Sequence, residues 1–587
     1  MKIFQKLWHL LPLKQRSAAI AILGFVFIGM VVEMLGVGLI IPALIIMTEN
    51  DLASKYPIVE PWLNMLGNPS HESLVIGGML ALVGVFALKA LFLTFLTWRQ
   101  ADFVSKIQSE ISKCLFEGYM HQPYTFHLQR NSAQLIRNTL GHASIFSGTI
   151  QQALVLIMET LVVAGISVVL LVVEPFGAVV VVSALGLTGW SFNRFTRNYI
   201  IHWGEEYQLH EGLRVQHIQQ GLGGVKDVKL LGRENDFFIQ YGVHNLGSAR
   251  IKKRQTILQA LPRLWLELIA VSGLAALVVI MIGQSKPVGM LIPVVGLFAV
   301  AAFRTMPSVN RLLNVFQSIS FSLPAINTLY DEFQLLNVAK APQSGHLLSF
   351  EKTLNLEQID FQYPSAEGLA LSKVNMSIPC GVSIGFVGCS GAGKSTLIDI
   401  ILGLLTPTDG AIKVDGIDIQ TNLRGWQDQI GYVPQSIYLT DDTFRRNIAF
   451  GLHVDQISEE AVWRALRSAQ LEQFVNELPQ GIDTVVGERG IRLSGGQRQR
   501  IGIARALYHD PAVLVLDEAT SSLDMETERG VMEAVRALHG DKTIFIVAHR
   551  FSTVEHCDYL YRLDKGKVVE EGKTSVVLRN ITEQTSS

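Results

Sequence analysis

The sequence contains few cysteines for its length. Four cysteines occur in 587 residues, and no two of them form a CxxC pair. They are Cys114, Cys380, Cys389 and Cys557. This spacing excludes a disulfide framework and a cysteine-ligated zinc site, and it is typical of free thiols in a reducing compartment.

Charge is also scarce, and unevenly so. Charged residues make up 17% of the chain, against about 25% in an average soluble protein. Residues 1–330 hold 42 of the 100 charged residues, about 13% of that segment, and residues 331–587 hold the other 58, about 23%. The first part therefore has the composition of a membrane domain and the second that of a soluble domain. The net charge of −2 argues against a nucleic-acid partner.

Six apolar segments of the first part are long enough to cross a bilayer, which takes about 20 helical residues. The predicted spans are 20–47, 74–97, 150–173, 176–195, 258–282 and 290–313. The first span is longer than the apolar core of a signal peptide and lacks a small-residue cleavage site, so we expect it to be retained.

Two long polar segments, 98–145 and 196–257, separate the inner ends of these spans. Their helical patterns predict that the membrane helices continue beyond the bilayer, and residues 124–135 and 221–231 are candidate coupling elements for the second domain. Lysine and arginine gather at the amino terminus and in these two segments. The positive-inside rule therefore places both segments, and the soluble part after an even number of crossings, in the cytoplasm.

The soluble part contains a phosphate-binding motif. An apolar run at 382–387 predicts a buried strand, residues 388–396 read GCSGAGKST, and an apolar helical run follows at 397–405. This is GxxxxGK[ST] in its strand–loop–helix context, where backbone N–H groups and a helix amino terminus bind phosphate. The predicted nucleotide-binding residues are Gly388, Ser390, Gly391, Gly393, Lys394, Ser395 and Thr396. We expect Lys394 to reach the β- and γ-phosphates and Ser395 to offer its hydroxyl to Mg²⁺.

An acidic pair ends a second predicted strand, at 513–516. Asp517 suits Mg²⁺ coordination at the carboxyl end of a buried strand, and Glu518 is placed to polarise the attacking water. The alternative is that the two carboxylates only cap the turn that follows. The phosphate loop upstream favours the catalytic interpretation.

Residues 493–497 read LSGGQ, directly before a helical run at 501–507. Ser494, Gly495 and Gly496 at a helix start form another anion site. This string is the signature of the ATP-binding cassette (ABC) proteins, which the chain therefore resembles.

The resemblance to ABC proteins extends to further motifs in the family's order. It implies that Tyr363 stacks on adenine, that Gln435 is the Q-loop glutamine near Mg²⁺, and that His549 is the catalytic switch histidine. It also implies that Gln497 and Asp524 belong to the nucleotide site, as signature and D-loop residues.

Six spans followed by one cassette is the layout of an ABC half-exporter. In that family the signature serine of one cassette closes over ATP bound at the phosphate loop of another. One chain holds one of each, so the resemblance implies a dimer. Both half-sites are intact here, which favours a homodimer.

Two membrane segments resemble those of bacterial flippases for lipid-linked oligosaccharides, the PglK type. Residues 261–267 read LPRLWLE and residues 303–311 read FRTMPSVNR. In that family basic residues line the inner cavity and meet the pyrophosphate of the lipid carrier. The resemblance makes Lys89, Arg263 and Arg304 candidate substrate contacts, although the family carries arginine at the position of Lys89.

Internal ion pairs are the alternative for two of these cations. A charge at span depth costs at least about 2.5–3.5 kcal/mol, so it faces a cavity or a partner. Glu33 could neutralise Lys89, and Glu267 lies four residues after Arg263 on one helix face. Arg304 has no acidic residue in its own span.

The predicted fold is an α-helical membrane domain with six transmembrane helices, of the ABC exporter type, followed by an α/β P-loop nucleotide-binding domain. The predicted limits are 1–330 for the membrane domain, 331–350 for a linker and 351–587 for the cassette. We predict an ATP- and Mg²⁺-dependent homodimeric flippase of the bacterial inner membrane that moves a polyprenyl-pyrophosphate-linked glycan. Alternatives are an exporter of lipid A, drugs or peptides, and a soluble cassette protein, which six spans disfavour.

Overall fold

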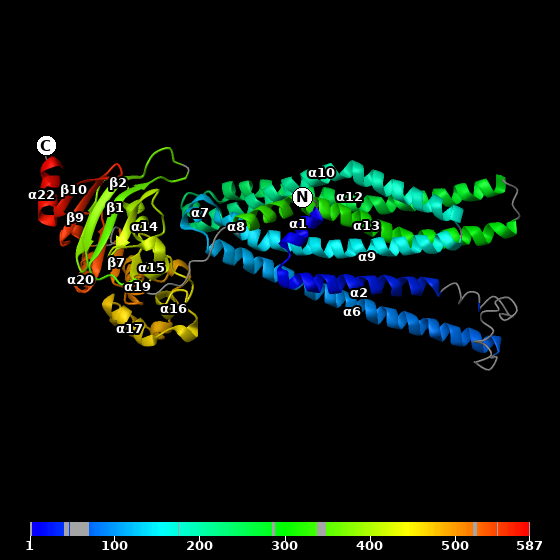
Figure 1. Cartoon of the computed structure of the whole chain (residues 1–587), viewed down its shortest axis with the longest axis horizontal. Helices are drawn as coiled ribbons and strands as arrows, with labels where there is room; N and C mark the ends of the chain where they lie inside the picture. The colour runs from blue at the N-terminus through cyan, green and yellow to red at the C-terminus, as the bar shows by residue number, and fades with distance from the viewer. Residues whose placement is uncertain are drawn as a thin grey trace. The chain divides into compact units, whose positions relative to one another are not determined.

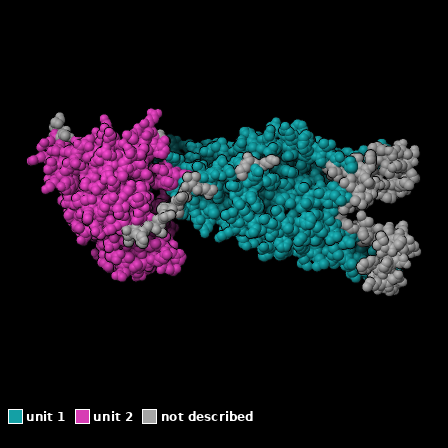
Figure 2. All heavy atoms as spheres, in the orientation of Figure 1, with its two compact units in different colours: residues 1–122, 129–339 teal, residues 123–128, 340–587 magenta. Residues whose placement is uncertain are grey.

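The computed structural model describes residues 3–39, 46, 70–173, 175–283, 288–336, 348–364, 366–519, 525–548 and 550–585. The chain divides into two units, shown in different colours in Figure 2. Unit 1 comprises Met1–Gln122 and Gln129–Ala339, and unit 2 comprises Pro123–Leu128 and Lys340–Ser587. The predicted domain limits stay a proposal, and the last helix of unit 1 continues to Leu336, inside the predicted linker.

Unit 1 is helical throughout its described residues (Figure 1). Its elements are α1 (Ile3–Leu10), α2 (Leu13–Gly38), α6 (His71–Met120), α8 (Ser132–Arg137), the π-helix η1 (Asn138–His142), α9 (Ala143–Val173), α10 (Pro175–Gly223), α11 (Val225–Leu230), α12 (Glu234–Gly283) and α13 (Val288–Leu336). Helices α6 and α12 have 50 residues each, and α10 and α13 have 49. At 1.5 Å per residue each is about 75 Å long. A hydrocarbon core is about 30 Å thick, so these helices continue far beyond a membrane, as predicted.

Three segments among the described residues are long and apolar enough to cross a membrane. They are Leu13–Gly36, His71–Met120 and Ser132–Val168, which contain most of the first three predicted spans. The last three predicted spans fall on α10, α12 and α13. Many side chains of these three helices are outside the described part of the chain. The last three spans therefore stay predictions.

The predicted coupling segments contain short helices in place of continuous ones. Residues 124–135 form α7 (Tyr124–Gln129) and the start of α8, because Asn131 caps a new helix by accepting from the N–H of Ala133. Residues 221–231 hold α11, which follows Gly224. Pro123–Leu128 belongs to unit 2 by its contacts, whereas α11 belongs to unit 1.

Unit 2 contains two sheets. Its strands are β1 (Thr353–Phe361), β2 (Leu371–Pro379), β3 (Ser383–Val387), β4 (Asp409–Val414), β5 (Ile417–Asp418), β6 (Ile430–Val433), β7 (Val513–Asp517), β8 (Thr543–Val547), β9 (Tyr559–Asp564) and β10 (Lys567–Lys573). A four-stranded antiparallel sheet has the order β2-β1-β4-β5. A six-stranded sheet has the order β10-β9-β3-β8-β7-β6 and is parallel except for β10.

Helices pack against this six-stranded sheet and against one another. They are α14 (Lys394–Ile401), α15 (Leu423–Gln427), α16 (Phe444–Ile448), α17 (Glu459–Ser468), α18 (Glu472–Asn476), α19 (Gly495–Leu507), α20 (Met525–Arg536), α21 (Phe551–Val554) and α22 (Thr574–Thr585), with 3₁₀ turns at Ile419–Asn422, Val454–Gln456, Gly481–Asp483 and Glu488–Gly490.

The central strands β3, β7 and β8 of the six-stranded sheet are buried on both faces, which explains their continuous apolar sequences. Side chains alternate between the faces. Ile544 and Ile546 of β8 join one hydrophobic cluster, with residues of α17, α19 and α20. Phe545 and Val547 of the same strand join another, with residues of α14 and the four-stranded sheet.

Trp426 anchors α15 in the second cluster. Its side chain is 0% exposed, and its indole N–H donates to the carbonyl of Ile401 at 2.7 Å, at the end of α14. Its ring lies edge-on to Phe350, 6.0 Å between centroids. The indole thus joins α15 to the helix that follows the glycine-rich loop.

We predict that Trp426→Ala destabilises the cassette by about 3–5 kcal/mol, the usual cost of removing a large buried aromatic side chain. Trp426→Phe should cost less, because the ring survives and only the bond to Ile401 is lost, worth about 1–3 kcal/mol. Thermal unfolding of the solubilised full chain measures both. Equal unfolding temperatures for wild type and Trp426→Ala would contradict this packing.

Candidate functional site

A glycine-rich loop connects β3 to α14. Gly388, Gly391 and Gly393 have φ angles of 153°, 80° and 99°. A Cβ atom on Gly388 would lie 2.3 Å from the carbonyl oxygen of Leu563, and one on Gly393 would lie 2.9 Å from that of Ala370. The turn therefore requires glycine at both ends. Ser390, Gly391 and Ser395 are exposed and open to a ligand.

Lys394 begins α14 and points back into the loop. Its ammonium donates to the carbonyls of Gly388 at 2.8 Å and Cys389 at 3.0 Å. The side chain is buried, and burial lowers its pKa, while the charges of Glu518 and Asp517 oppose that shift. The loop thus holds a cation against its own backbone, an arrangement suited to phosphate.

The aromatic residue predicted to stack on adenine lies beside the same helix. The hydroxyls of Tyr363 and Thr396 are 3.1 Å apart. The Tyr363 ring also lies edge-on to Phe361, with centroids 4.9 Å apart.

The acidic pair lies at the carboxyl end of β7, as predicted: Asp517 is the last residue of the strand and Glu518 follows it. The Glu518 carboxylate accepts from the side-chain N–H of Gln435 at 2.7 Å, and Asp517 accepts from the hydroxyl of Tyr432 at 3.4 Å. Glu518 has a φ of 48°, a strained conformation for a non-glycine residue, and its N–H donates to Val547 of β8 at 3.0 Å. The backbone bond to β8 holds the main chain of Glu518 at the end of the strand, and the bond from Gln435 holds its carboxylate.

The topology explains why these residues meet. In an open parallel sheet, ligands bind at the carboxyl ends of the strands. Gln435 follows β6, the acidic pair ends β7, and the glycine-rich loop follows β3, with β8 between β7 and β3. His549 follows β8 in the chain but lies outside the described residues, as does Asp524.

The oxygen atoms here fit Mg²⁺. Asp517 offers a carboxylate, Ser395 an exposed hydroxyl, and Gln435 an amide whose N–H₂ is already directed at Glu518. Carboxylate, hydroxyl and amide oxygens are hard ligands of the kind that Mg²⁺ takes, together with substrate phosphates.

A third carboxylate, Asp399, was not predicted for this region. It lies in α14, and burial, then the charge of Asp517, raises its pKa to about 6. Its signal in the sequence was a single acid inside the apolar run after the phosphate loop.

The signature segment forms the start of α19. The Ser494 hydroxyl accepts from the N–H of Gln497 at 3.2 Å, and the Gln497 side chain accepts from the N–H of Ser494 at 2.9 Å. This capping box fixes the helix start at Gly495, in agreement with the helix start expected at Ser494, Gly495 and Gly496. Among the described residues, no hydrogen bond joins Ser494, Gly495, Gly496 or Gln497 to the glycine-rich loop of the same chain.

In unit 1, two of the three candidate substrate contacts form ion pairs. Lys89 lies 2.9 Å from Glu33, and Arg263 lies 2.9 Å from Glu267 one helical turn later. Both pairs were the alternatives to a substrate role. The side chain of the third candidate, Arg304, lies outside the description.

Arg263 and Glu267 also line a cavity of about 500 Å³. Asn310 and Arg311 of α13 line it too, and Arg311 pairs with Glu159 of α9 at 3.0 Å. Glu159 is buried, with one carboxylate oxygen lacking a hydrogen-bond partner among the described atoms. It was missed in the sequence, where its signal was a lone acid within the third apolar span.

Fold and site together define an ATP-hydrolysing cassette joined to a multi-pass membrane domain. The sequence matches the ABC transporter family over residues 371–521 and the ABC transporter transmembrane region over residues 19–303. The chain belongs to the ABC transporter family, with the layout of a half-exporter, and is an ATP-driven translocase. Half-exporters generally work as dimers.

The relatives and a solved structure agree with this assignment. An ATP-dependent lipid A-core flippase of Nitrosococcus oceani is 30% identical over 517 residues, covering 85% of this chain and 83% of that protein. One from Vibrio vulnificus strain YJ016 is 29% identical over 600 residues, covering 98% and 95%. A bacterial Atm1-family ABC exporter with ATP bound has the same fold, with a TM-score of 0.77 at 23% identity over 96% of both chains.

We predict that Glu518→Gln retains ATP binding but lowers ATP turnover by at least about a hundredfold, the scale of losing a general base. Glutamine keeps the acceptor that Gln435 requires, so the fold should be unaffected. Steady-state ATPase assays with nucleotide binding on the same preparation measure this. Glu533→Gln, at an exposed position of α20, is the matched control. Near-normal turnover of the Glu518 variant would remove its catalytic assignment.

Proposed function

We propose that the protein is a homodimeric, ATP-driven flippase that moves an anionic glycolipid across the bacterial inner membrane, with its cassette in the cytoplasm. The observation that carries this proposal is the similarity, along nearly the whole chain, to proteins named ATP-dependent lipid A-core flippases. That similarity includes the membrane domain, where the substrate binds. It favours a lipid of the lipid A-core type over the polyprenyl-pyrophosphate-linked glycan predicted first.

The lipid-linked oligosaccharide is the second candidate. It is supported by residues 261–267 and 303–311, which resemble the PglK-type flippases. Part of both segments lines the cavity that contains Arg263 and Arg311, so an anionic head group would meet guanidinium groups there. Arginine suits both substrates, because its planar fork binds phosphate bidentately. The PglK-type specificity therefore stays a prediction.

The nucleotide site supports the following assignment of roles. Lys394 and the loop's N–H groups would bind the β- and γ-phosphates, and Tyr363 would stack on the base. Ser395, Gln435 and Asp517 would hold Mg²⁺, which neutralises phosphate charge when bound. Glu518 orients and deprotonates the attacking water, held by its bond to Gln435.

The remaining groups are assigned by the family motifs. His549 would stabilise the transferring phosphoryl group. Ser494, Gly495, Gly496, Gln497 and Asp524 would complete the site of a second chain. Phosphoryl transfer needs mostly positioning and charge stabilisation, which this set supplies.

The charged residues of the membrane domain have two roles in this proposal. The pairs Lys89–Glu33 and Arg263–Glu267 neutralise charge in the resting chain. When a phosphate head group binds, Lys89 and Arg263 would leave their carboxylate partners and pair with the phosphate. Arg304 would supply a further positive charge.

ATPase stimulation across a panel of lipids tests the proposed substrate. We expect lipid A-core to stimulate turnover in lipid nanodiscs, a lipid-linked oligosaccharide to do so if the second candidate is correct, and neutral drugs to have no effect. Stimulation by drugs alone would contradict a glycolipid substrate.

Arg304 variants test the substrate contact. Arg304→Ala should lose lipid stimulation and keep basal turnover, because the cassette is unchanged. Arg304→Lys should keep part of the stimulation, since the charge survives without the bidentate geometry. Equal loss of yield and basal turnover in both variants would indicate a packing role instead.

The composite site is tested by mixing variants. Lys394→Ala and Ser494→Arg should each abolish turnover alone. Heterodimers purified with two different tags should recover activity, because one site then combines intact Lys394 with intact Ser494. Heterodimers of two differently tagged Lys394→Ala chains are the control. Failure of the mixed pair to exceed this control would contradict a working site shared between chains.

A further inference from the structure

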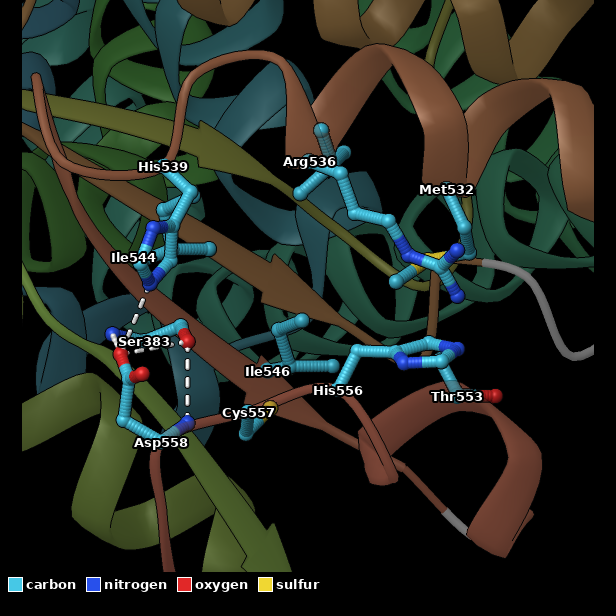
Figure 3. A pocket seen from close by; sticks show the side chains of 11 residues that line it. Ser383, Met532, Arg536, His539, Ile544, Ile546, Thr553, His556, Cys557 and Asp558 are labelled. Carbon is cyan, nitrogen blue, oxygen red and sulfur yellow. Dashed lines mark hydrogen bonds and ion pairs between the residues drawn. The ribbon is translucent and has the colours of Figure 1, made fainter.

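A cavity in unit 2, separate from the one in unit 1, lies away from the nucleotide site. It has a volume of about 310 Å³ and lies on the face of the six-stranded sheet that α20 covers (Figure 3). Ser383, the first residue of β3, lines it, whereas the phosphate loop follows the last residue of that strand. At about 3.3 Å per residue, four residues separate the two sites by about 13 Å.

One part of the cavity is apolar. Met532 and Val535 line it from one face of α20, and Ile544 and Ile546 from alternate positions of β8. All four belong to the hydrophobic cluster on this side of the sheet. They offer an apolar ligand group a surface already removed from water.

The polar part of the cavity contains one permanently charged cation, Arg536, and two imidazoles. Arg536, His539 and His556 line it, and Asp558 is the one acidic residue among the lining side chains. In Figure 3, Arg536 and His556 lie on one side of the view, and His539 and Asp558 on the other.

The single acid is already bound to protein groups. Asp558 accepts from the N–H and hydroxyl of Ser383, at 2.8 and 3.0 Å, and lies 2.9 Å from the imidazole of His539. Burial opposes its ionisation, but these bonds outweigh it, so the pKa of Asp558 lies below its usual value. Among the described residues Arg536 forms no ion pair, and the imidazole of His556 lies 3.0 Å from the carboxylate of the exposed Glu555. The cavity therefore favours an anion next to Arg536.

The size and chemistry of the cavity narrow the class of ligand. Small-molecule sites have volumes of about 300–1,000 Å³ and are mostly apolar, with a few polar groups. This cavity is at the lower end of that range, so it favours a ligand smaller than a nucleoside triphosphate or a lipid chain. Burial raises the pKa of the lining thiol, Cys557, to about 12, so a covalent adduct there is disfavoured.

We propose that this cavity binds a small amphiphilic anion, a carboxylate or phosphate monoester with one compact apolar group, and that the anion regulates ATP turnover. The anionic group pairs with Arg536, and the apolar group packs on Val535, Ile544 and Ile546.

Three elements connect the cavity with the ATP machinery. Strand β3 runs from Ser383 into the phosphate loop, and β8 runs from the cavity toward His549. Helix α20 begins at Met525, directly after Asp524. A ligand that shifts these elements against one another changes the positions of the phosphate loop, His549 and Asp524. The regulation depends only on ATP hydrolysis, not on the identity of the transported lipid.

The test uses the full chain in lipid nanodiscs, with 4-phenylbutyrate as the probe. The uncharged 4-phenylbutanol and empty nanodiscs control for partition into the bilayer. We expect saturable calorimetric binding of the acid, and a change in ATP turnover over the same concentration range. Loss of a charge-assisted bond should weaken binding at least about tenfold in Arg536→Gln. Arg529→Gln, which removes the same charge from an exposed position of the same helix, should bind normally.

A second variant, Val535→Phe, fills the cavity without changing charge and should abolish binding. No saturable binding of the acid at millimolar concentrations would overturn the proposal. So would equal weakening by the Arg536 and Arg529 substitutions, which would indicate only a general charge effect. Binding without any change in turnover would overturn the regulatory part.

Discussion

The cassette depends on one tight turn, in which the chain leaves β3 and enters α14. The backbone approaches Leu563 at Gly388 and Ala370 at Gly393 so closely that a Cβ atom fits at neither position. This approach buries Lys394 beneath the loop, where its ammonium is held by two loop carbonyls. It also sets the start of α14, whose far end is tied to α15 through Trp426. Phosphate binding and packing of the cassette therefore rest on the same few backbone contacts.

The parallel sheet then determines which other groups can act on the phosphate. Strands β6, β7 and β8 end at the same edge as β3, so Gln435 and Glu518 meet there although 83 residues separate them in the chain. The strained backbone at Glu518 costs of order 1–3 kcal/mol, and its N–H bond to β8 helps to offset it. Such strain at the end of a buried strand is consistent with a role in positioning the carboxylate.

Much of the cassette site could be predicted from sequence, because its motifs are local. The strands at 382–387 and 513–516 lie within one residue of β3 and β7, since continuous apolar runs mark strands buried on both faces. The pair Arg263–Glu267 followed from helical spacing alone. The start of α19 at the signature serine was expected from Ser494 and the two glycines, whereas the apolar run at 501–507 alone marks only the later turns, because Ser494 and Gln497 cap the helix by polar bonds. Contacts between residues far apart in the sequence, such as Arg311 with Glu159, could not be predicted. The sequence shows only that each of these charges lies in an apolar span, and not which partner it meets.

We propose that ATP hydrolysis in this cassette moves a lipid from one leaflet to the other. The most direct test of this proposal is the leaflet distribution of head-group-labelled lipid A-core in proteoliposomes, read with a membrane-impermeant quencher before and after ATP is added. We expect a progressive, ATP-dependent loss of the lipid from the leaflet on the cassette side, at a rate that follows ATP turnover. Sustained hydrolysis with an unchanged leaflet distribution, for both lipid A-core and a lipid-linked oligosaccharide, would contradict it.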